Sequence, residues 1–193
     1  MSEEKQVINY KQQLDDKLWC TKKCRMNAEK RLLSNDLLLN FSNIYYSIFI
    51  AILSILSLIS SNRVYTVTSV IFSVALVISI TFASSLSFKE RAEKMKRNYL
   101  DINQLERRLK YVNEDDVTMI DEIEKEYINL LDNVENHLEF DYYKFLKYNK
   151  KQEFNCKIMV KYCFHKIIRC LFGILIVVLP ALLLVLVLKL NIR

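Results

Sequence analysis

Three long runs of the chain contain no charged or histidine side chain. They cover residues 37–62, 64–88 and 170–188, and only Arg63 separates the first run from the second. A helix crosses a bilayer with about 20 mostly apolar residues at roughly 1.5 Å rise each, so each run is long enough or nearly so. The pattern predicts three membrane-spanning helices. The short connection at residues 60–63 predicts that the first two form an antiparallel hairpin.

A buried core helix of a soluble protein is the alternative for each run. The third run is built almost entirely from Leu, Ile and Val, with Pro180 in its middle. Each such side chain favours insertion by roughly 0.3–0.6 kcal/mol, whereas one charge opposes it by about 2.5–3.5 kcal/mol. The first two runs hold more Ser and Thr, and their adjacency is what favours a membrane hairpin there.

Lys and Arg near the ends of the runs predict the orientation. They cluster before the hairpin at residues 22–31, after it at residues 89–97, and before the third run at residues 144–169. Cytoplasmic flanks of membrane helices carry such an excess of positive charge. We therefore expect the N-terminus and the central helices in the cytoplasm, the C-terminus outside, and membrane lipids as partners.

The composition indicates an all-α membrane protein, because the chain has one Gly and one Pro and no alternating strand pattern. We expect a transmembrane helical hairpin, cytoplasmic helices and a third, C-terminal transmembrane helix. The segments are a cytoplasmic N-terminal helix (1–43), the hairpin (44–88), a cytoplasmic helical region (89–169) and the last span (170–190). The net charge of +6 fits side chains facing an anionic leaflet, so no direct contact with nucleic acid is expected.

The first helix carries a narrow seam for another helix, with residues at alternating spacings of four and three: Leu14, Leu18, Thr21, Arg25, Ala28 and Leu32. Arg25 lies inside this seam, and a buried charge requires a partner. We expect a carboxylate from the helix that follows the hairpin, where the candidates are Glu90, Glu93, Asp101 and Glu106. This predicts contact between the two helices.

Two further helices are predicted after the hairpin. Apolar side chains recur at helical spacing in both, first at Tyr99, Ile102, Leu105, Leu109 and Val112, and then at Ile120, Ile123, Tyr127, Leu130, Val134 and Leu138. Residues 113–116 predict a turn with an acidic N-cap between the helices. Residues 114–141 are strongly acidic and residues 144–169 strongly basic. The opposite charges of the two segments could pair two helices of one chain or two neighbouring subunits. Alternatively, the segments could form a solvated acidic helix followed by a lipid-facing basic one.

No catalytic, cofactor or metal site emerges from the residue pattern. The chain has no phosphate-binding Gly loop, His137 and His165 are isolated, and Cys20 and Cys24 lack companion ligands. Cys156, Cys163 and Cys170 share one helical face at seven-residue intervals. Packing is the favoured interpretation of these three thiols, with metal or redox sensing as the alternative. We expect a protein that is not an enzyme.

Small and hydroxylated side chains mark the hairpin, at Ser47, Ala51, Ser54, Ser57 and Ser61 in the first span and at Thr66, Ser69 and Ser73 in the second. Such residues usually mean close helix packing, and a water-filled pore is the sharper alternative. Neither span holds an ionisable group of the kind used in proton-coupled transport or charge-ring filters. The third span lacks Ser and Thr, which favours a lipid-facing anchor.

The chain resembles a known family in two stretches that flank the hairpin. These are Trp19, Thr21, Lys22, Lys23, Arg25, Asn27, Ala28 and Arg31, and then Phe88, Lys89, Arg91, Ala92, Lys94, Met95, Lys96 and Tyr99. Over roughly residues 10–165 this pattern resembles the SLATT domain, found in bacterial two-transmembrane effectors associated with SMODS nucleotidyltransferases and SLOG sensors. The third run departs from a strict two-span domain and leaves open which helices would build a pore.

The resemblance implies a role in antiphage defence by abortive infection. A partner would detect infection, and the effector would oligomerise or open in the bacterial inner membrane and collapse the ion gradient. The implied partners are a homo-oligomer and a nucleotidyltransferase or reverse-transcriptase system, with a cyclic nucleotide as signal. Trp19, Thr21, Arg25, Asn27 and Arg31 would couple the signal, and Ser47, Ser54, Ser57, Ser61, Ser69 and Ser73 would line or pack the pore. The alternatives are a non-conducting membrane scaffold that recruits a partner and, third, a constitutive small-ion channel.

Overall fold

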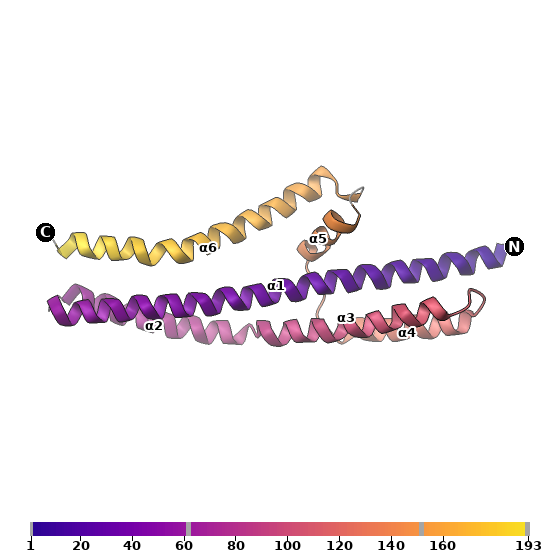
Figure 1. Ribbon diagram of the computed structural model, residues 1–193, viewed down its shortest axis with the longest axis horizontal. Coiled ribbons are helices and arrows are strands. Elements are labelled where there is room, and N and C mark those ends of the chain that lie inside the picture. The colour runs from indigo at the N-terminus through magenta and orange to yellow at the C-terminus, as the bar shows by residue number, and fades with distance from the viewer. Residues whose placement is uncertain (1, 61–62, 151–152, 192–193) are drawn as a thin grey trace. The chain divides into compact units, whose positions relative to one another are not determined.

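The computed structural model describes residues 2–60, 63–150 and 153–191. Over these residues the chain forms helices joined by short connections (Figure 1): α1 (Ser2–Ser60), α2 (Arg63–Ser85), α3 (Phe88–Tyr111), α4 (Val117–Asp132), α5 (Glu139–Asn149) and α6 (Cys156–Asn191). The prediction of an all-α fold is confirmed. The chain divides into two compact units, the first from residues 1–33 and 89–163 and the second from residues 34–88 and 164–193.

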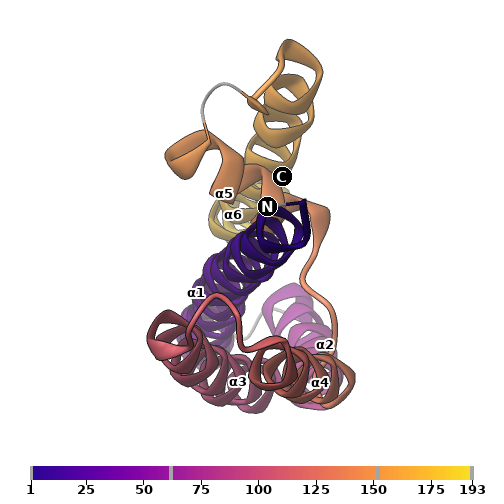
Figure 2. The ribbon, with the colours of Figure 1, turned by 90° about the vertical axis from the view of Figure 1, so that its right-hand side faces the viewer.

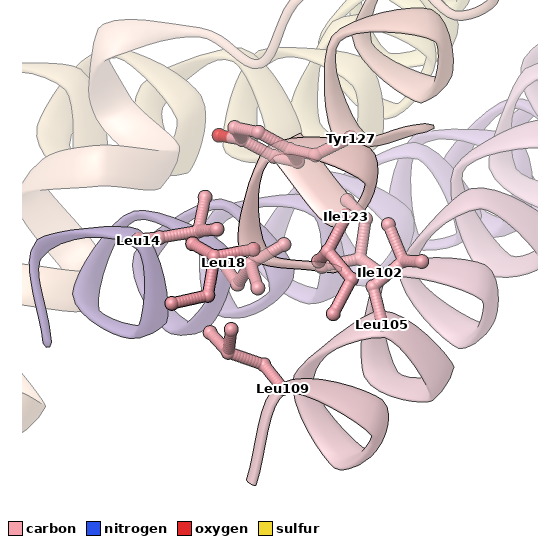
Figure 3. Close-up of a cluster of buried hydrophobic side chains, with 8 residues drawn as sticks. Leu14, Leu18, Ile102, Leu105, Leu109, Ile123 and Tyr127 are labelled. Atoms are coloured by element: carbon pink, nitrogen blue, oxygen red, sulfur yellow. The ribbon is translucent and has the colours of Figure 1, made fainter. Parts of the chain in front are cut away.

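The core of the first unit forms where α1, α3 and α4 meet (Figure 3). Its buried side chains are Leu14, Leu18, Ile102, Leu105, Leu109, Ile120, Ile123 and Tyr127. Burying one such side chain contributes about 1.5–3 kcal/mol relative to leaving it in water. In both ribbon views α3 and α4 lie on one side of α1 and α5 lies on the other (Figures 1 and 2). The predicted seam of α1 and its contact with α3 are therefore confirmed.

The start of α4 follows the predicted cap. Asp116 precedes the helix, and its carboxylate accepts a hydrogen bond from the Met119 amide at 3.1 Å. The Thr118 hydroxyl donates to the same carboxylate oxygen at 2.8 Å. These contacts satisfy free donors in the first turn, where a negative charge also suits the positive end of the helix.

The end of α4 differs from the sequence-based prediction. The helix ends at Asp132, so Val134 and Leu138 lie outside it, and Leu138 is 54% exposed. The side chains of Asn136 and Asp141 accept hydrogen bonds from backbone amides in this stretch. Short polar side chains compete in this way for the donors that a helix would use, so the chain turns without Gly or Pro.

The second unit contains the apolar parts of the chain. Among the described residues, three stretches, in α1, α2 and α6, are long and apolar enough to cross a membrane. Within the hairpin, Phe49 and Leu53 of α1 pack with Tyr65 and Phe72 of α2. Many large apolar side chains point outward, such as Leu58 at 84% exposed. A lipid environment explains this exposure, because a soluble domain rarely leaves so much apolar surface in water.

Helix α6 makes specific contacts in the second unit. The Tyr46 hydroxyl of α1 donates to the Ile176 carbonyl at 3.3 Å, and the Tyr45 hydroxyl donates to the Val177 carbonyl at 3.0 Å. Pro180 has no N–H, so the Ile176 carbonyl four residues earlier lacks its usual helical donor. Most apolar side chains of this span are exposed, as expected of a lipid-facing helix, but α6 also contacts α1, because Tyr46 supplies a missing hydrogen bond in an apolar region.

We expect Tyr46→Phe to weaken the packing of α6 by about 1 kcal/mol, in the range measured for hydrogen bonds between membrane helices. The readout is the thermal unfolding midpoint of the full chain in lipid nanodiscs, followed by circular dichroism. Pro180→Ala restores an N–H to the Ile176 carbonyl, so Tyr46→Phe should cost much less in that background. An equal cost in both backgrounds would show that the hydroxyl does not compensate for the proline.

Candidate functional site

Several side chains of the Trp19 motif contact α4 and α5 in the first unit. Trp19 packs edge-on against Phe145 of α5, with the ring centroids 5.1 Å apart. The Thr21 hydroxyl shares a hydrogen bond with the Tyr127 hydroxyl of α4 at 2.7 Å. Cys24 is buried in the same apolar cluster as Phe145. The N-terminal part of α1 therefore binds both helices through residues that are close together in the sequence.

Asp141 is the point where two motif residues meet. Its fully buried carboxylate accepts hydrogen bonds from the Arg31 guanidinium, Nε to Oδ1 at 3.0 Å and Nη2 to Oδ2 at 3.0 Å. Its backbone carbonyl accepts a hydrogen bond from the Asn27 side-chain amide at 3.0 Å. The Leu138 amide donates to the same carboxylate at 3.1 Å. Two-point pairing of Arg with a carboxylate is strong and directional, so it fixes the start of α5 on α1.

Arg25 is buried as the seam predicts, with 1% of its surface exposed. Within the described residues its hydrogen-bond partner is the Leu130 carbonyl of α4, which accepts from Nη1 at 3.3 Å, while Nε has no partner. The expected pairing with a carboxylate of α3 is therefore wrong. Leu130 lies in the last turn of α4, where unpaired carbonyls form the negative end of the helix dipole. That helix end takes the place of a carboxylate.

Other buried polar atoms near this helix end also lack partners. Asn98 of α3 donates to the Leu130 carbonyl at 2.7 Å. Within the described residues, Asn98 Oδ1 accepts no hydrogen bond and His137 Nδ1 takes part in none. Burial lowers the pKa of Arg25. Burial also lowers the pKa of His137, where the charge of Asp141 opposes the shift and Arg25 adds to it. The site therefore disfavours a second positive charge.

Lys22 supplies the ion pair that links α1 to α3. Its ammonium group contacts the carboxylate of Glu106, one of the candidates named for Arg25. Lys110 contacts the same carboxylate at 3.2 Å. Burial acts to raise the pKa of Glu106, but the hydrogen bonds from the two lysines outweigh it and leave the pKa below its ordinary value. The predicted contact between the helices is correct, with Lys22 in the role expected of Arg25.

The acidic side chains of α4 and of the segment after it pair with basic side chains of α1 and α3. The pairs are Lys17–Glu124 at 3.4 Å, Arg108–Glu126 at 2.6 Å and Arg91–Glu135 at 2.8 Å. Exposed pairs of this kind contribute about 0–1 kcal/mol each, so they orient α4 more than they stabilise it. Of the alternatives for the segregated charge, these contacts favour helix pairing within one chain. The basic partners precede the acidic segment rather than follow it.

The predicted serine stripe of α1 divides between two environments in the second unit. Ser47 and Ser54 are exposed, and each hydroxyl donates to a carbonyl of its own helix, at 2.7 Å and 2.9 Å. Ser57 is half-buried and its hydroxyl bonds to that of Thr66 in α2. Ser57 therefore joins the two helices of the hairpin, whereas the other two serines leave their oxygens on the outer surface.

The serines of the α2 stripe are less accessible. Ser69 is buried and donates to the Thr66 carbonyl at 2.9 Å, and the half-buried Ser73 donates to the Val70 carbonyl at 2.8 Å. Ser61 lies outside the described residues. Thr66, the third hydroxylated residue named for this span, is exposed. Among the described serines of the two stripes, Ser47 and Ser54 are the exposed ones, which a second molecule or water could reach most easily.

A cavity of about 340 Å³ lies between α1, α2 and α6 in the second unit. Its walls are mostly apolar, and its polar groups include Ser42, Asn43, Tyr46 and Ser79. None of these side chains titrates near neutral pH, so the cavity offers no acid–base chemistry. Over the part of the chain that the structure describes, no group of three or more His, Cys, Asp or Glu side chains is placed to hold a metal ion.

Asp141 and the tyrosine pair of α1 are not among the residues predicted from the sequence. Along the chain Asp141 is one of many acidic residues, although a carboxylate three residues after the start of a helix often accepts a hydrogen bond from the amide at that start. Tyr45 and Tyr46 lie within an apolar run, where nothing in the spacing marks them. The available signal was Pro180, which leaves a carbonyl in the third run without its helical donor.

The chain matches the family described as SMODS and SLOG-associating 2TM effector domain family 5 over residues 8–187. No curated protein and no solved structure shows significant similarity to it. The matched region extends to residue 187 and covers nearly all of the third apolar run, which the resemblance to a two-span domain left unexplained.

Proposed function

The chain belongs to the SLATT family 5 of 2TM effector domains, and on this premise we propose that it is a membrane effector that assembles into a pore and depolarises the bacterial inner membrane. The family comprises membrane-associated effectors of conflict and defence systems that are generally not enzymes, and SLATT domains associate with SMODS and SLOG signalling systems. In the proposed orientation the N-terminus and α3 to α5 are cytoplasmic and the C-terminus lies outside.

The continuity of α1 is the observation that carries this proposal. One unbroken helix, Ser2–Ser60, contains both the Trp19 motif and the first apolar run. The motif binds α4 and α5 through Thr21, Asn27 and Arg31. A signal that changes how α4 or α5 binds α1 therefore acts on the same helix that enters the membrane. Trp19, Thr21, Arg25, Asn27 and Arg31 form the coupling site in this proposal.

The trigger comes from a partner. A nucleotidyltransferase or reverse-transcriptase system, or the cyclic nucleotide that such a system makes, would act on the cytoplasmic helices and end in abortive infection. Within the described residues, Arg25 and Asn98 each keep a buried polar atom without a hydrogen-bond partner. This supports a role as a switch, because a contact that leaves polar atoms unpaired is easier to release.

The test is inducible expression in bacterial cells, with a membrane-potential dye and propidium uptake. We expect depolarisation and growth arrest from the full chain, alone or with its neighbouring genes. A chain truncated after Arg169 would assign the pore to the hairpin if it depolarises equally, and would give α6 a part in the pore if it does not. Growing, polarised cells in every combination, with insertion confirmed, would contradict the proposal.

Within the proposed pore, Ser54 and Ser57 line or pack the conducting path. Replacing both with Leu should lower propidium uptake by an order of magnitude or more, because the larger apolar side chains would close a narrow polar path. Thr81→Leu is the control, since Thr81 is an exposed hydroxyl of α2 outside the stripes. Unchanged permeabilisation by the Ser54 and Ser57 variant would exclude the lining role.

A non-conducting scaffold is the second candidate. Exposed acidic side chains such as Glu122 and Asp132 give α4 a surface on which a basic partner could bind. A scaffold predicts no toxicity at any expression level, and its function would be lost on reversing these charges while membrane potential stayed unchanged.

A further inference from the structure

One face of α6 carries a seven-residue repeat that no other part of the described chain covers. Its members follow spacings of four and three: Cys156, Val160, Cys163, Ile167, Cys170, Ile174 and Val177. All seven are exposed, with Val160 at 60% and Ile167 at 56%. The favoured interpretation of the three cysteines as packing residues is therefore wrong within one chain. We call these seven residues the α6 seam.

The side-chain contacts of α6 within its own chain use other residues. Tyr162 stacks on Phe140 with the ring centroids 5.2 Å apart, and Arg169 donates to the Ser34 hydroxyl at 2.7 Å. The Ile176 carbonyl accepts the hydrogen bond from Tyr46. Tyr162, Arg169 and Ile176 lie away from the seam on a helix with 3.6 residues per turn. Val177, the last seam residue, accepts a hydrogen bond from Tyr45 through its backbone carbonyl, while its side chain stays exposed. The fold therefore leaves the seam side chains free while it holds α6 mainly by a different face.

Lipid alone does not account for the seam. Its first half lies before the apolar run, in a stretch that also contains Lys157, Lys161 and Lys166. Charged side chains place this stretch at the headgroups or in water, where acyl chains do not cover Val160 and Ile167. Spacings of four and three sustained across three repeats are the pattern of a helix that packs against another helix.

We propose that the α6 seam binds the α6 seam of a second copy of this chain, with the two helices parallel. Copies of one membrane protein insert in the same orientation, because the same Lys and Arg residues determine it. Two α6 helices in one membrane therefore run parallel with identical residues at the same depth. Val160, Ile167 and Ile174 occupy alternate seam layers, the positions at which parallel two-stranded coiled coils carry β-branched side chains. The small cysteines between them permit close approach.

The flanks of the seam fit the same pairing. In a parallel pair, the residue before one seam layer faces the residue five positions later in the partner helix. Met159 of one copy then faces Phe164 of the other, a favourable contact between a thioether and an aromatic ring. Lys166 faces Leu171, so this lysine meets no like charge. Met159, Phe164 and Leu171 are all exposed within a single chain, as this arrangement requires.

This inference rests on the proposed function for its membrane setting and deepens it by naming the contact through which two copies assemble. The seam would bring two hairpins together without using the serine stripes. Assembly and conduction are therefore separable, and they can be measured on the same sample.

The test is disulfide cross-linking of the full chain in bacterial membranes at low protein-to-lipid ratio, with copper phenanthroline as the oxidant. The background carries Cys156→Ala, Cys163→Ala and Cys170→Ala and keeps Cys20 and Cys24. Ile167→Cys in this background tests the seam. Ile168→Cys is the matched control, since it is similarly exposed at the same depth but faces another direction. A variant that retains Cys163 alone of the three tests a native position.

We expect Ile167→Cys and the Cys163 variant to form a species of twice the 22.9 kDa chain mass at least ten times faster than Ile168→Cys. Equal rates for Ile167→Cys and Ile168→Cys would mean random collision and would overturn the proposal, as would absence of cross-linking at both seam positions. Depolarisation is recorded in parallel. Conduction without seam cross-linking would retain the proposed pore and reject the seam contact. Seam cross-linking without conduction would retain the seam contact and reject the proposed pore.

Discussion

Arg31→Ala should lower the free energy of unfolding of the first unit by about 3–5 kcal/mol, the cost of leaving one partner of a buried ion pair unpaired. Asp141 has no exposed surface, and Arg31 contacts both of its carboxylate oxygens. Without Arg31, the Leu138 amide is the one hydrogen-bond donor that the described residues still offer to the oxygens of this carboxylate. The start of α5 would then detach from α1 before the core of α1, α3 and α4 unfolds.

Trp19 gives a direct readout of this change, because it is the only Trp in the chain and packs on Phe145 of α5. Tryptophan emission of the full chain in nanodiscs is followed against urea. We expect a transition at lower urea in Arg31→Ala. The shift should be smaller when Asp141→Ala is combined with it, because the double variant leaves no carboxylate buried without its partner. Arg97→Ala is the control, since Arg97 makes an exposed pair with Glu93. An Arg31→Ala transition that coincides with that of Arg97→Ala would contradict the prediction.

Arg25→Met should leave the first unit as stable as the natural chain or more stable, whereas Arg25→Ala should be less stable than Arg25→Met by about 2–5 kcal/mol. Met fills similar volume and removes a buried charge that has, among the described residues, one hydrogen bond and no partner for its Nε. Ala removes the charge but leaves a cavity. The Leu130 carbonyl keeps the Asn98 amide as a donor in both variants.

The same urea transitions measure the Arg25 variants, with the exposed Arg107→Met as the control. Equal destabilisation by Met and Ala would show that the guanidinium stabilises the end of α4 by more than its burial costs. Because Arg25 belongs to the proposed coupling site, Arg25→Met also separates stability from function. A stable variant that no longer depolarises cells would support a switching role, and unchanged depolarisation would remove Arg25 from that role.

The patterns that sequence analysis interpreted correctly are local ones. The seam of α1, the apolar stripe of α3 and the Asp116 cap each depend on residues within one helix or one turn, so their spacing is visible along the chain. The three apolar runs are equally local, since insertion depends on the summed hydropathy of about 20 neighbouring residues. The motif around Trp19 likewise identified the family.

Tertiary structure decided which partner each polar side chain takes. The sequence showed that Arg25 is buried but not that the end of α4 would face it, and the acidic candidates on α3 were more obvious partners. Arg31 and Asp141 are 110 residues apart, and many acidic residues stand in that interval. Similarly, Tyr46 and Ile176 meet across 130 residues. Periodicity reports which face of a helix is covered, but the covering partner depends on how distant segments pack. The sequence by itself therefore determined the all-α fold, the candidate spans and the family, and only the folded chain determined where α4 ends and which contacts join the helices.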